Sequence, residues 1–155
     1  YSVTVFRVSS DEAVGLGCLD GRIGDNGIED VDAFSWVERI NLLGTYAGER
    51  NVGVGSEGLP EAKEDAWTIF WDKKPLVLKQ ELEVIVQNED GSTENRVLPA
   101  GTELIPQETD KETYLDAETS DGTRCRIEVE TEDGYTYMIH GVDEHAYFAD
   151  LPYAG

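Results

Sequence analysis

Between residues 82 and 141 apolar and polar residues alternate in short bursts, which Gly-, Asp- and Pro-rich turns separate. Successive side chains of a β-strand point in opposite directions, so every second residue of such a burst falls on the same face. The positions that share a face are apolar in two bursts, Leu82, Val84 and Val86 in the first and Cys125, Ile127 and Val129 in the second. This periodicity predicts antiparallel strands with one buried face and one face in water.

The first 75 residues predict further β-structure with minor helix. Alternation over residues 2–8 and 13–19, with a polar turn between them, predicts a β-hairpin. Short helices are expected over residues 29–34 and 60–66, the second because Pro60 suits a first helical turn and acidic residues follow it. A strand is expected after the first of these helices, over residues 35–43, and another, rich in aromatics, over residues 67–71.

The polar segment 72–75, closed by Pro75, is the expected boundary of a second part. Strands are expected beyond it over residues 76–87, 93–98, 102–106, 113–118, 124–130 and 135–140. A single helical turn is expected within residues 142–153, packing Tyr147, Phe148 and Leu151. The prediction is a β-rich segment with short helices, residues 1–75, packed on a small antiparallel β-barrel, residues 76–155.

The order of motifs in the second part resembles a known family. Leu98-Pro99-Ala100-Gly101-Thr102-Glu103-Leu104 follows a turn, an aromatic-led strand begins at Tyr114, and Asp121-Gly122 precedes a closing strand that ends in Ile139-His140-Gly141. This order resembles the bacterial SH3-like domains of exported cell-surface proteins and lipoproteins. The resemblance implies a five-stranded SH3-like barrel and a binding module for cell-wall glycan or peptide, or for another protein, with no cofactor. Tyr114 stands where the family commonly has tryptophan.

Charge and hydropathy narrow the classes of partner. The chain of 155 residues carries 12 Lys and Arg against 33 Asp and Glu, a formal net charge of -21. Such a charge repels phosphate backbones and anionic headgroups, so neither nucleic acid nor a membrane surface is an expected partner. No apolar run approaches the ~18 residues of a membrane span. The chain starts at Tyr1 without Met, and we interpret it as part of an extracytoplasmic, cell-surface or secreted protein.

Two cysteines and two histidines provide few starting points for catalysis. Cys18 and Cys125 lie on the apolar sides of their strands, so buried free thiols are expected, with a single long-range disulfide as the alternative. His140 and His145 are five residues apart, which does not place both rings on one helical face as a zinc pair requires. The sequence therefore predicts a non-catalytic module.

Acidic residues keep an enzymatic alternative open. A hydrolase using paired carboxylates is compatible with so many acids, because their separation depends on the fold. The acidic loop over residues 20–32 is a candidate for Ca²⁺, which prefers several oxygen ligands; its acids are Asp20, Asp25, Glu29, Asp30 and Asp32. A purely structural spacer domain is the third interpretation.

Aromatic residues give the candidate ligand site. Tyr135 and Tyr137 fall on one face of the strand expected over residues 135–140, and Tyr114 begins a neighbouring strand. Such rings stack sugars or prolines through their apolar faces and offer hydroxyls for hydrogen bonds. The alternative is that these tyrosines are half-buried packing residues of the barrel.

Overall fold

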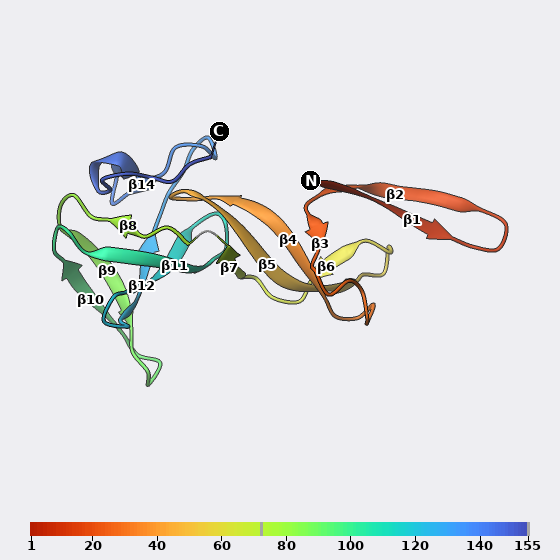
Figure 1. Cartoon of the computed structure of the whole chain (residues 1–155), viewed down its shortest axis with the longest axis horizontal. Coiled ribbons are helices and arrows are strands. Elements are labelled where there is room, and N and C mark those ends of the chain that lie inside the picture. Colours follow the sequence, from red (N-terminus) through yellow and green to blue (C-terminus); the bar gives the residue numbers. More distant parts are fainter. Residues whose placement is uncertain (72, 155) are drawn as a thin grey trace.

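Antiparallel strands make up most of the chain, and the computed structural model describes residues 1–71 and 73–154 (Figure 1). The strands of the first part are β1 (Ser2–Val8), β2 (Ala13–Asp20), β3 (Arg22–Ile23), β4 (Phe34–Asn41), β5 (Thr45–Val54), β6 (Pro60–Ala62) and β7 (Trp67–Trp71). Those of the second part are β8 (Leu76–Val77), β9 (Leu82–Gln87), β10 (Thr93–Leu98), β11 (Glu103–Thr109), β12 (Tyr114–Thr119), β13 (Arg124–Glu128), β14 (Met138–Ile139) and β15 (Val142–Asp143).

One large sheet runs through both parts of the described chain. Its path is β10-β9-β13-β12-β11-β7-β5-β4-β3, with β6 added to β5 and β8 to β11. Every pairing within it is antiparallel. The mainly β, antiparallel class is therefore confirmed, whereas the sheet remains open and does not close into the five-stranded barrel that was expected.

Pairing between β7 and β11 joins the two parts. Trp67 lies opposite Thr109 and Thr68 opposite Glu108, so these hydrogen bonds bridge the expected boundary at residues 72–75. Residue 72 lies outside the described residues. The hydrophobic core is likewise shared, because the same cluster of buried side chains contains Ile40 and Ile69 from the first part and Leu104 from the second.

The predicted alternation of buried and exposed residues is correct in β9 and β13 of the second part. Leu82, Val84 and Val86 of β9 are all buried, as are Cys125 and Ile127 of β13 and Val129 just after it. Residues 76–87 nevertheless do not form one continuous strand. They bend between β8 and β9 because Leu78 bridges to Phe148 and the Lys79 N–H donates to the Tyr147 carbonyl at 2.7 Å.

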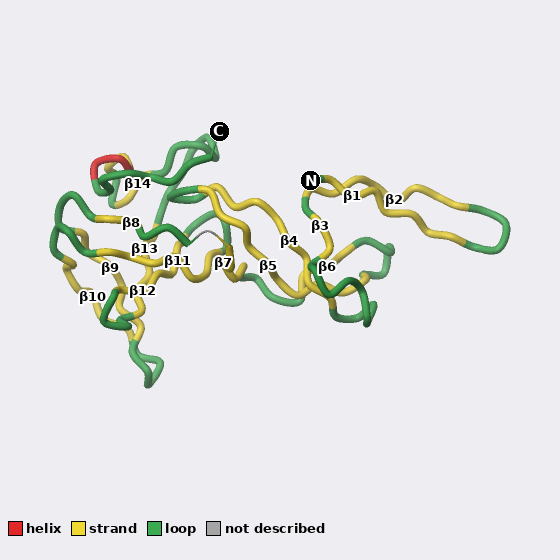
Figure 2. Tube along the Cα trace, viewed as in Figure 1, coloured by secondary structure: helices red, strands yellow, loops and turns green. Residues whose placement is uncertain are grey.

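Neither of the two short helices expected in the first part is formed. Residues 60–62 are strand β6, in which Pro60 pairs with Val54 at a sheet edge, a position where a missing N–H costs nothing. Residues 29–34 form a turn closed by a bridge between Asp30 and Ala33. The one helical element of the described residues is a 3₁₀ turn, Glu144–Ala146 (Figure 2).

The expected turn in the tail is confirmed, but the strand before it is shorter than expected. Phe148 is 2% exposed, and Tyr147 and Leu151 pack partly buried against the core. Of residues 135–140, only Met138–Ile139 is strand. The Asp133 carboxylate accepts the N–H groups of Tyr135 and Thr136 at 2.8 Å each, which holds that segment in a turn.

The hairpin of β1 and β2 is confirmed, and it forms a sheet of its own that projects from the body (Figure 1). We call residues 1–20 the arm. Its register shifts between Val5 and Phe6, so that Leu16 is the extra residue of a β-bulge on β2. On one face the Arg7 guanidinium donates to the Glu57 carbonyl at 3.0 Å. Cys18 is exposed on this arm, which corrects the expectation that it is buried.

Candidate functional site

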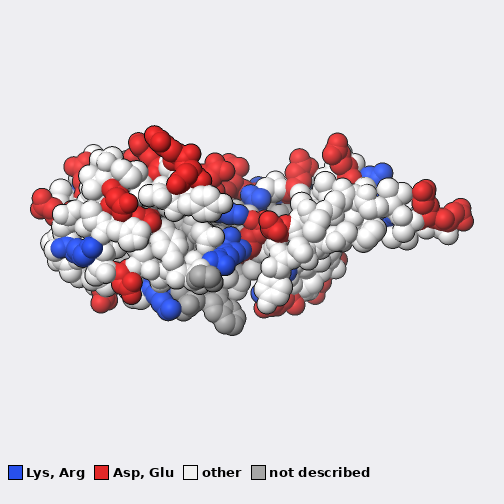
Figure 3. Space-filling view, turned by 90° about the horizontal axis from the view of Figure 1, so that it is seen from above, with Lys and Arg blue, Asp and Glu red and all other residues white. Residues whose placement is uncertain are grey.

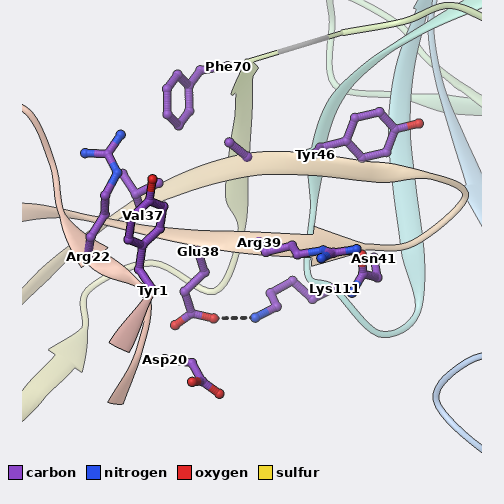
Figure 4. A pocket seen from close by; sticks show the side chains of 12 residues that line it. Tyr1, Asp20, Arg22, Val37, Glu38, Arg39, Asn41, Tyr46, Phe70 and Lys111 are labelled. Atoms are coloured by element: carbon purple, nitrogen blue, oxygen red, sulfur yellow. Dashed lines mark hydrogen bonds and ion pairs between the residues drawn. The ribbon is translucent and has the colours of Figure 1, made fainter. Parts of the chain in front are cut away.

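A cavity of about 680 Å³ lies where the root of the arm meets β4 and the turn between β11 and β12 (Figure 4). We call it the junction cavity. Its charged side chains are Asp20, Arg22, Glu38, Arg39 and Lys111, and its aromatic side chains are Tyr1, Tyr46 and Phe70. The cavity is thus assembled from segments that lie far apart in the sequence.

Gly21 brings the root of the arm close to β4. Its φ of +115° is a conformation that side chains with a Cβ rarely adopt, and its N–H donates to the Tyr1 carbonyl at 3.0 Å. A Cβ at this position would lie 2.6 Å from Nε1 of Trp36 and 2.7 Å from the Val37 carbonyl oxygen. Only glycine allows this approach, so the shape of the cavity depends on residue 21.

The turn between β11 and β12 delivers Lys111 to the cavity. Asp110 organises the turn by accepting the N–H groups of Glu112 at 2.9 Å and Thr113 at 2.8 Å. Partial burial acts to raise the pKa of Asp110, but these hydrogen bonds, together with that from the Thr113 hydroxyl, outweigh it and the pKa lies below its ordinary value. Lys111 itself has a φ of +76°.

Glu38 holds the Lys111 ammonium at the wall of the cavity. The two side chains form an ion pair (Figure 4). Glu38 also accepts the indole N–H of Trp36 at 3.1 Å. The Lys111 Nζ atom lies 4.8 Å from the centroid of the Trp67 ring, within the range of a cation–π contact. The ammonium is therefore fixed in place by groups on β4 and β7.

Two arginines complete the cationic lining. Arg22 donates through Nη1 to the Asp25 carboxylate at 2.7 Å and to the Ile23 carbonyl at 3.2 Å. Arg39 donates through Nε to Asn41 Oδ1 at 3.0 Å and through Nη2 to the Ala154 carbonyl. A guanidinium has five N–H donors, so these contacts hold each group while leaving further donors for a ligand.

The junction cavity concentrates positive charge on an acidic protein. It is lined by three of the chain's 12 Lys and Arg but by two of its 33 Asp and Glu. In Figure 3 blue side chains gather between the body and the arm, whereas red ones spread over the body and the tip of the arm. Beside an aromatic ring such as Phe70, this lining suits a ligand that carries a carboxylate or another anionic group.

The three tyrosines predicted as a ligand site lie in different environments. Tyr114 is half-buried at the start of β12, Tyr135 is 84% exposed on the turn before β14, and Tyr137 is 4% exposed. The Tyr137 hydroxyl donates to the Asn41 carbonyl at 2.8 Å, which makes it a packing residue of the core. Within the described chain no hydrogen bond or ring contact joins any two of the three.

Arg126 covers one ring face of Tyr114. Its guanidinium lies 3.6 Å from the ring centroid and makes a bidentate pair with Asp116, with Nε–Oδ1 at 2.7 Å and Nη2–Oδ2 at 2.8 Å. Gln87 donates to the same carboxylate at 3.2 Å. Burial raises the pKa of Tyr114, opposed by the Arg126 charge. This guanidinium therefore occupies one of the two ring faces on which a ligand could stack.

The other candidate groups engage in local contacts. In the acidic loop, Asp25 pairs with Arg22 and Asp30 accepts the Asp32 N–H at 2.9 Å. Among the described residues no three His, Cys, Asp or Glu side chains are grouped so that they could hold a metal ion. His140 Nε2 meets the Glu83 carbonyl at 3.0 Å, and His145 meets Asp143.

The two cysteines are both free thiols and differ in reactivity. Cys125 is buried as expected, and burial, with the nearby Asp116 charge, raises the pKa of its thiol to about 11. The exposed Cys18 is the accessible thiol of the described chain.

Sequence reasoning missed the lining of the junction cavity. Arg22, Arg39 and Lys111 were not singled out, although a signal existed in their scarcity, because each cation of so acidic a chain is unusual. These three side chains meet because the pairing of distant strands brings residues 20–22, 37–41 and 111 together. No local sequence pattern reveals such long-range pairing.

Comparison with known protein families, curated proteins and solved structures finds no match to this chain. In the part of the chain that is described, no helix has the length and apolar character needed to cross a bilayer.

Proposed function

We propose that the protein is a non-catalytic, extracytoplasmic binding module of a bacterial cell-surface protein, and that the junction cavity receives an anionic segment of cell-wall glycan or peptide. The observation that carries this proposal is the gathering of Arg22, Arg39 and Lys111 around one cavity of an otherwise acidic chain. Cations placed in this way attract an anion locally, while the net charge keeps polyanions such as nucleic acid away.

The cavity has the elements that recognition of such a segment requires. Guanidinium groups recognise carboxylates through paired N–H donors, and the exposed side of Phe70 offers an apolar ring face. Glu38 sets the selectivity, because a ligand carboxylate competes with it for the Lys111 ammonium. A neutral ligand cannot replace Glu38 as the ionic partner of Lys111 and should therefore bind more weakly.

The pairing of residues 76–87 supports an SH3-like arrangement of the second part. This segment pairs with β11 through β8 and with β13 through β9, as a sharply bent strand does at the edge of a small barrel. β11, β12 and β13 follow one another as neighbours between these two contacts. The ring of Tyr135, which is 84% exposed, is a second proposed contact for a ligand, separate from the junction cavity.

Soluble peptidoglycan fragments that carry free carboxylates, titrated into the protein and followed by calorimetry, test this proposal. Lys111→Met should weaken binding, whereas Lys79→Met, which removes an exposed lysine outside the cavity, should leave it unchanged. Glu38→Gln should tighten binding, because the Lys111 ammonium loses its competing partner. Added salt should weaken binding by screening.

Equal effects of Lys111→Met and Lys79→Met would refute the assignment of the site. Binding of neutral and acidic fragments with the same affinity would refute the selectivity. No binding to any fragment would favour the spacer interpretation instead.

A further inference from the structure

The arm leaves an apolar face and a strand edge uncovered. β1 and β2 pair only with each other among the described residues, so each has one edge without a neighbouring strand. The face opposite Arg7 carries Thr4, Phe6 and Val8, with Phe6 57% and Val8 74% exposed. Isolated two-stranded hairpins are marginally stable in water, and a regular exposed edge is a template for another strand.

The charge pattern distinguishes the arm from the rest of the chain. Residues 2–8 and 13–19 contain one cation, Arg7, and no acid, whereas the whole chain carries 33 acids. Figure 3 shows this as a pale surface along the arm, with acidic side chains at its tip. Because the arm projects from the body, a molecule that docks on it stays away from the acidic surface (Figure 1).

The two edges of the arm are not equivalent. β2 contains the bulge at Leu16 between Gly15 and Gly17, and bulges and glycines disrupt pairing at an edge. β1 pairs through seven residues and contains neither proline nor glycine. Its edge is the regular one.

We infer that β1 pairs with β1 of a second copy of this chain, which gives a four-stranded sheet in the order β2-β1-β1-β2 across a twofold axis. Antiparallel pairing centred on Val5 places Ser2 opposite Val8, Val3 opposite Arg7 and Thr4 opposite Phe6 of the second copy. In this register Arg7 faces a valine, so no like charges meet. Each Phe6 gains a threonine as its cross-strand neighbour.

This self-pairing goes beyond the proposed ligand binding and does not depend on it. The two bodies lie at opposite ends of the paired arms, because each arm extends away from its own body (Figure 1). The remaining repulsion between two chains of net charge -21 opposes association. Salt should therefore strengthen the dimer, the reverse of its effect on an anionic ligand.

Sedimentation of the whole protein at low and high salt tests the inference. The expected species is a dimer of 17.2 kDa chains that becomes tighter as salt is added. Phe6→Glu should weaken it roughly tenfold or more, because the change acts on both symmetry-related pairs. Val14→Glu, which changes an exposed valine of β2, is the matched control and should have little effect.

Mixing two variants tests the register. Phe6→Glu and Thr4→Lys should each dimerise weakly alone, and their mixture should recover affinity because residue 6 of one chain lies opposite residue 4 of the other. A mixture no tighter than its components would refute this register.

The exposed thiol of Cys18 allows the distance between the two copies in the proposed dimer to be measured. It lies opposite Thr4 in the hairpin, and the buried Cys125 thiol, with its pKa raised to about 11, will not react under the same conditions. With strands ~4.8 Å apart and a rise of ~3.4 Å per residue, the two Cys18 Cα atoms should be ~16 Å apart. Spin labels on Cys18 should report that separation, extended by the label arms.

Several results would overturn the inference. A monomer at every salt concentration would do so, as would a dimer that salt weakens or that Phe6→Glu leaves intact. A disulfide that forms readily between two Cys18 residues would place the β2 edges together and would equally exclude the β1 pairing.

Discussion

Gly21 at the root of the arm offers the sharpest test of how the junction cavity is built. Substitution by alanine places a Cβ 2.6 Å from Trp36 Nε1, 2.7 Å from the Val37 carbonyl oxygen and 2.8 Å from Glu38 Cγ. The carbonyl belongs to the β4 backbone and cannot rotate away. We therefore expect two separate costs, one from the positive φ and one from the contacts.

These costs can be estimated independently. A left-handed conformation costs a residue with a Cβ roughly 1–2 kcal/mol, and overpacking costs about 1–3 kcal/mol. Gly21→Ala should thus lower the free energy of unfolding by about 2–5 kcal/mol. Gly27→Ala is the matched control, because Gly27 has a φ of +69° but nothing within 4 Å of a new Cβ. It should cost about 1–2 kcal/mol.

Urea denaturation followed by tryptophan fluorescence measures both variants. The difference between them isolates the contacts between the arm root and β4, and it should exceed about 1 kcal/mol. Equal losses would refute the reasoning, since they would mean that the arm root moves away from Trp36 and Val37 without penalty.

Two further predictions concern buried acids. Burial raises the pKa of Glu144 above its ordinary value of 4.5, against the opposing effect of the hydrogen bond from Tyr153. Native stability is therefore lost as the pH rises from about 4.5 to the folded-state pKa and is constant above it, so Glu144→Gln should gain stability relative to the natural chain across that interval and keep the gain at higher pH. Thermal melts from acidic to neutral pH that show the same difference at every pH would contradict this. Arg126→Met should lower the free energy of unfolding by about 2–4 kcal/mol, because it leaves the carboxylate of Asp116 buried without its cation. Urea denaturation measures this loss. Recovery of stability in the double variant Arg126→Met/Asp116→Leu would identify the unpaired charge as the cause.

The alternation of apolar and polar residues was sufficient to predict the strands whose two faces differ. In β9 every second side chain points to the same face of the strand, and this face packs in the hydrophobic core. The buried residues are Leu82, Val84 and Val86. The hairpin of residues 2–19 was predicted from the same signal and its polar turn. Such patterns succeed where the structure depends on neighbours in the sequence.

Distant contacts decided the elements that were predicted incorrectly. Pro60 and its following acids suit a helix start, but β5 offers an edge on which residues 60–62 pair. Alternation also placed Cys18 on a buried side, whereas Cys18 is exposed in a two-stranded sheet that pairs with no other strand of the described residues. The cavity lining was unpredictable for the same reason, since Arg22 lies in β3 and Lys111 in the turn between β11 and β12, and strands β4, β5 and β7 lie between β3 and β11 in the sheet.

The last residues of the chain complete the turn between β4 and β5. Thr45 N–H donates to the Pro152 carbonyl at 3.0 Å, Ala154 N–H donates to the Thr45 hydroxyl at 3.0 Å, and Tyr137 reaches back to Asn41. During synthesis β4 and β5 leave the ribosome long before residues 137–154 are made. Contacts between residues so far apart in the sequence also form slowly, because a long loop must close first. The β4–β5 hairpin must therefore stay incompletely covered until residues 137–154 have been made. Chaperones that shield nascent apolar strands should consequently raise the yield of this protein more than they do for one whose early strands find their partners locally.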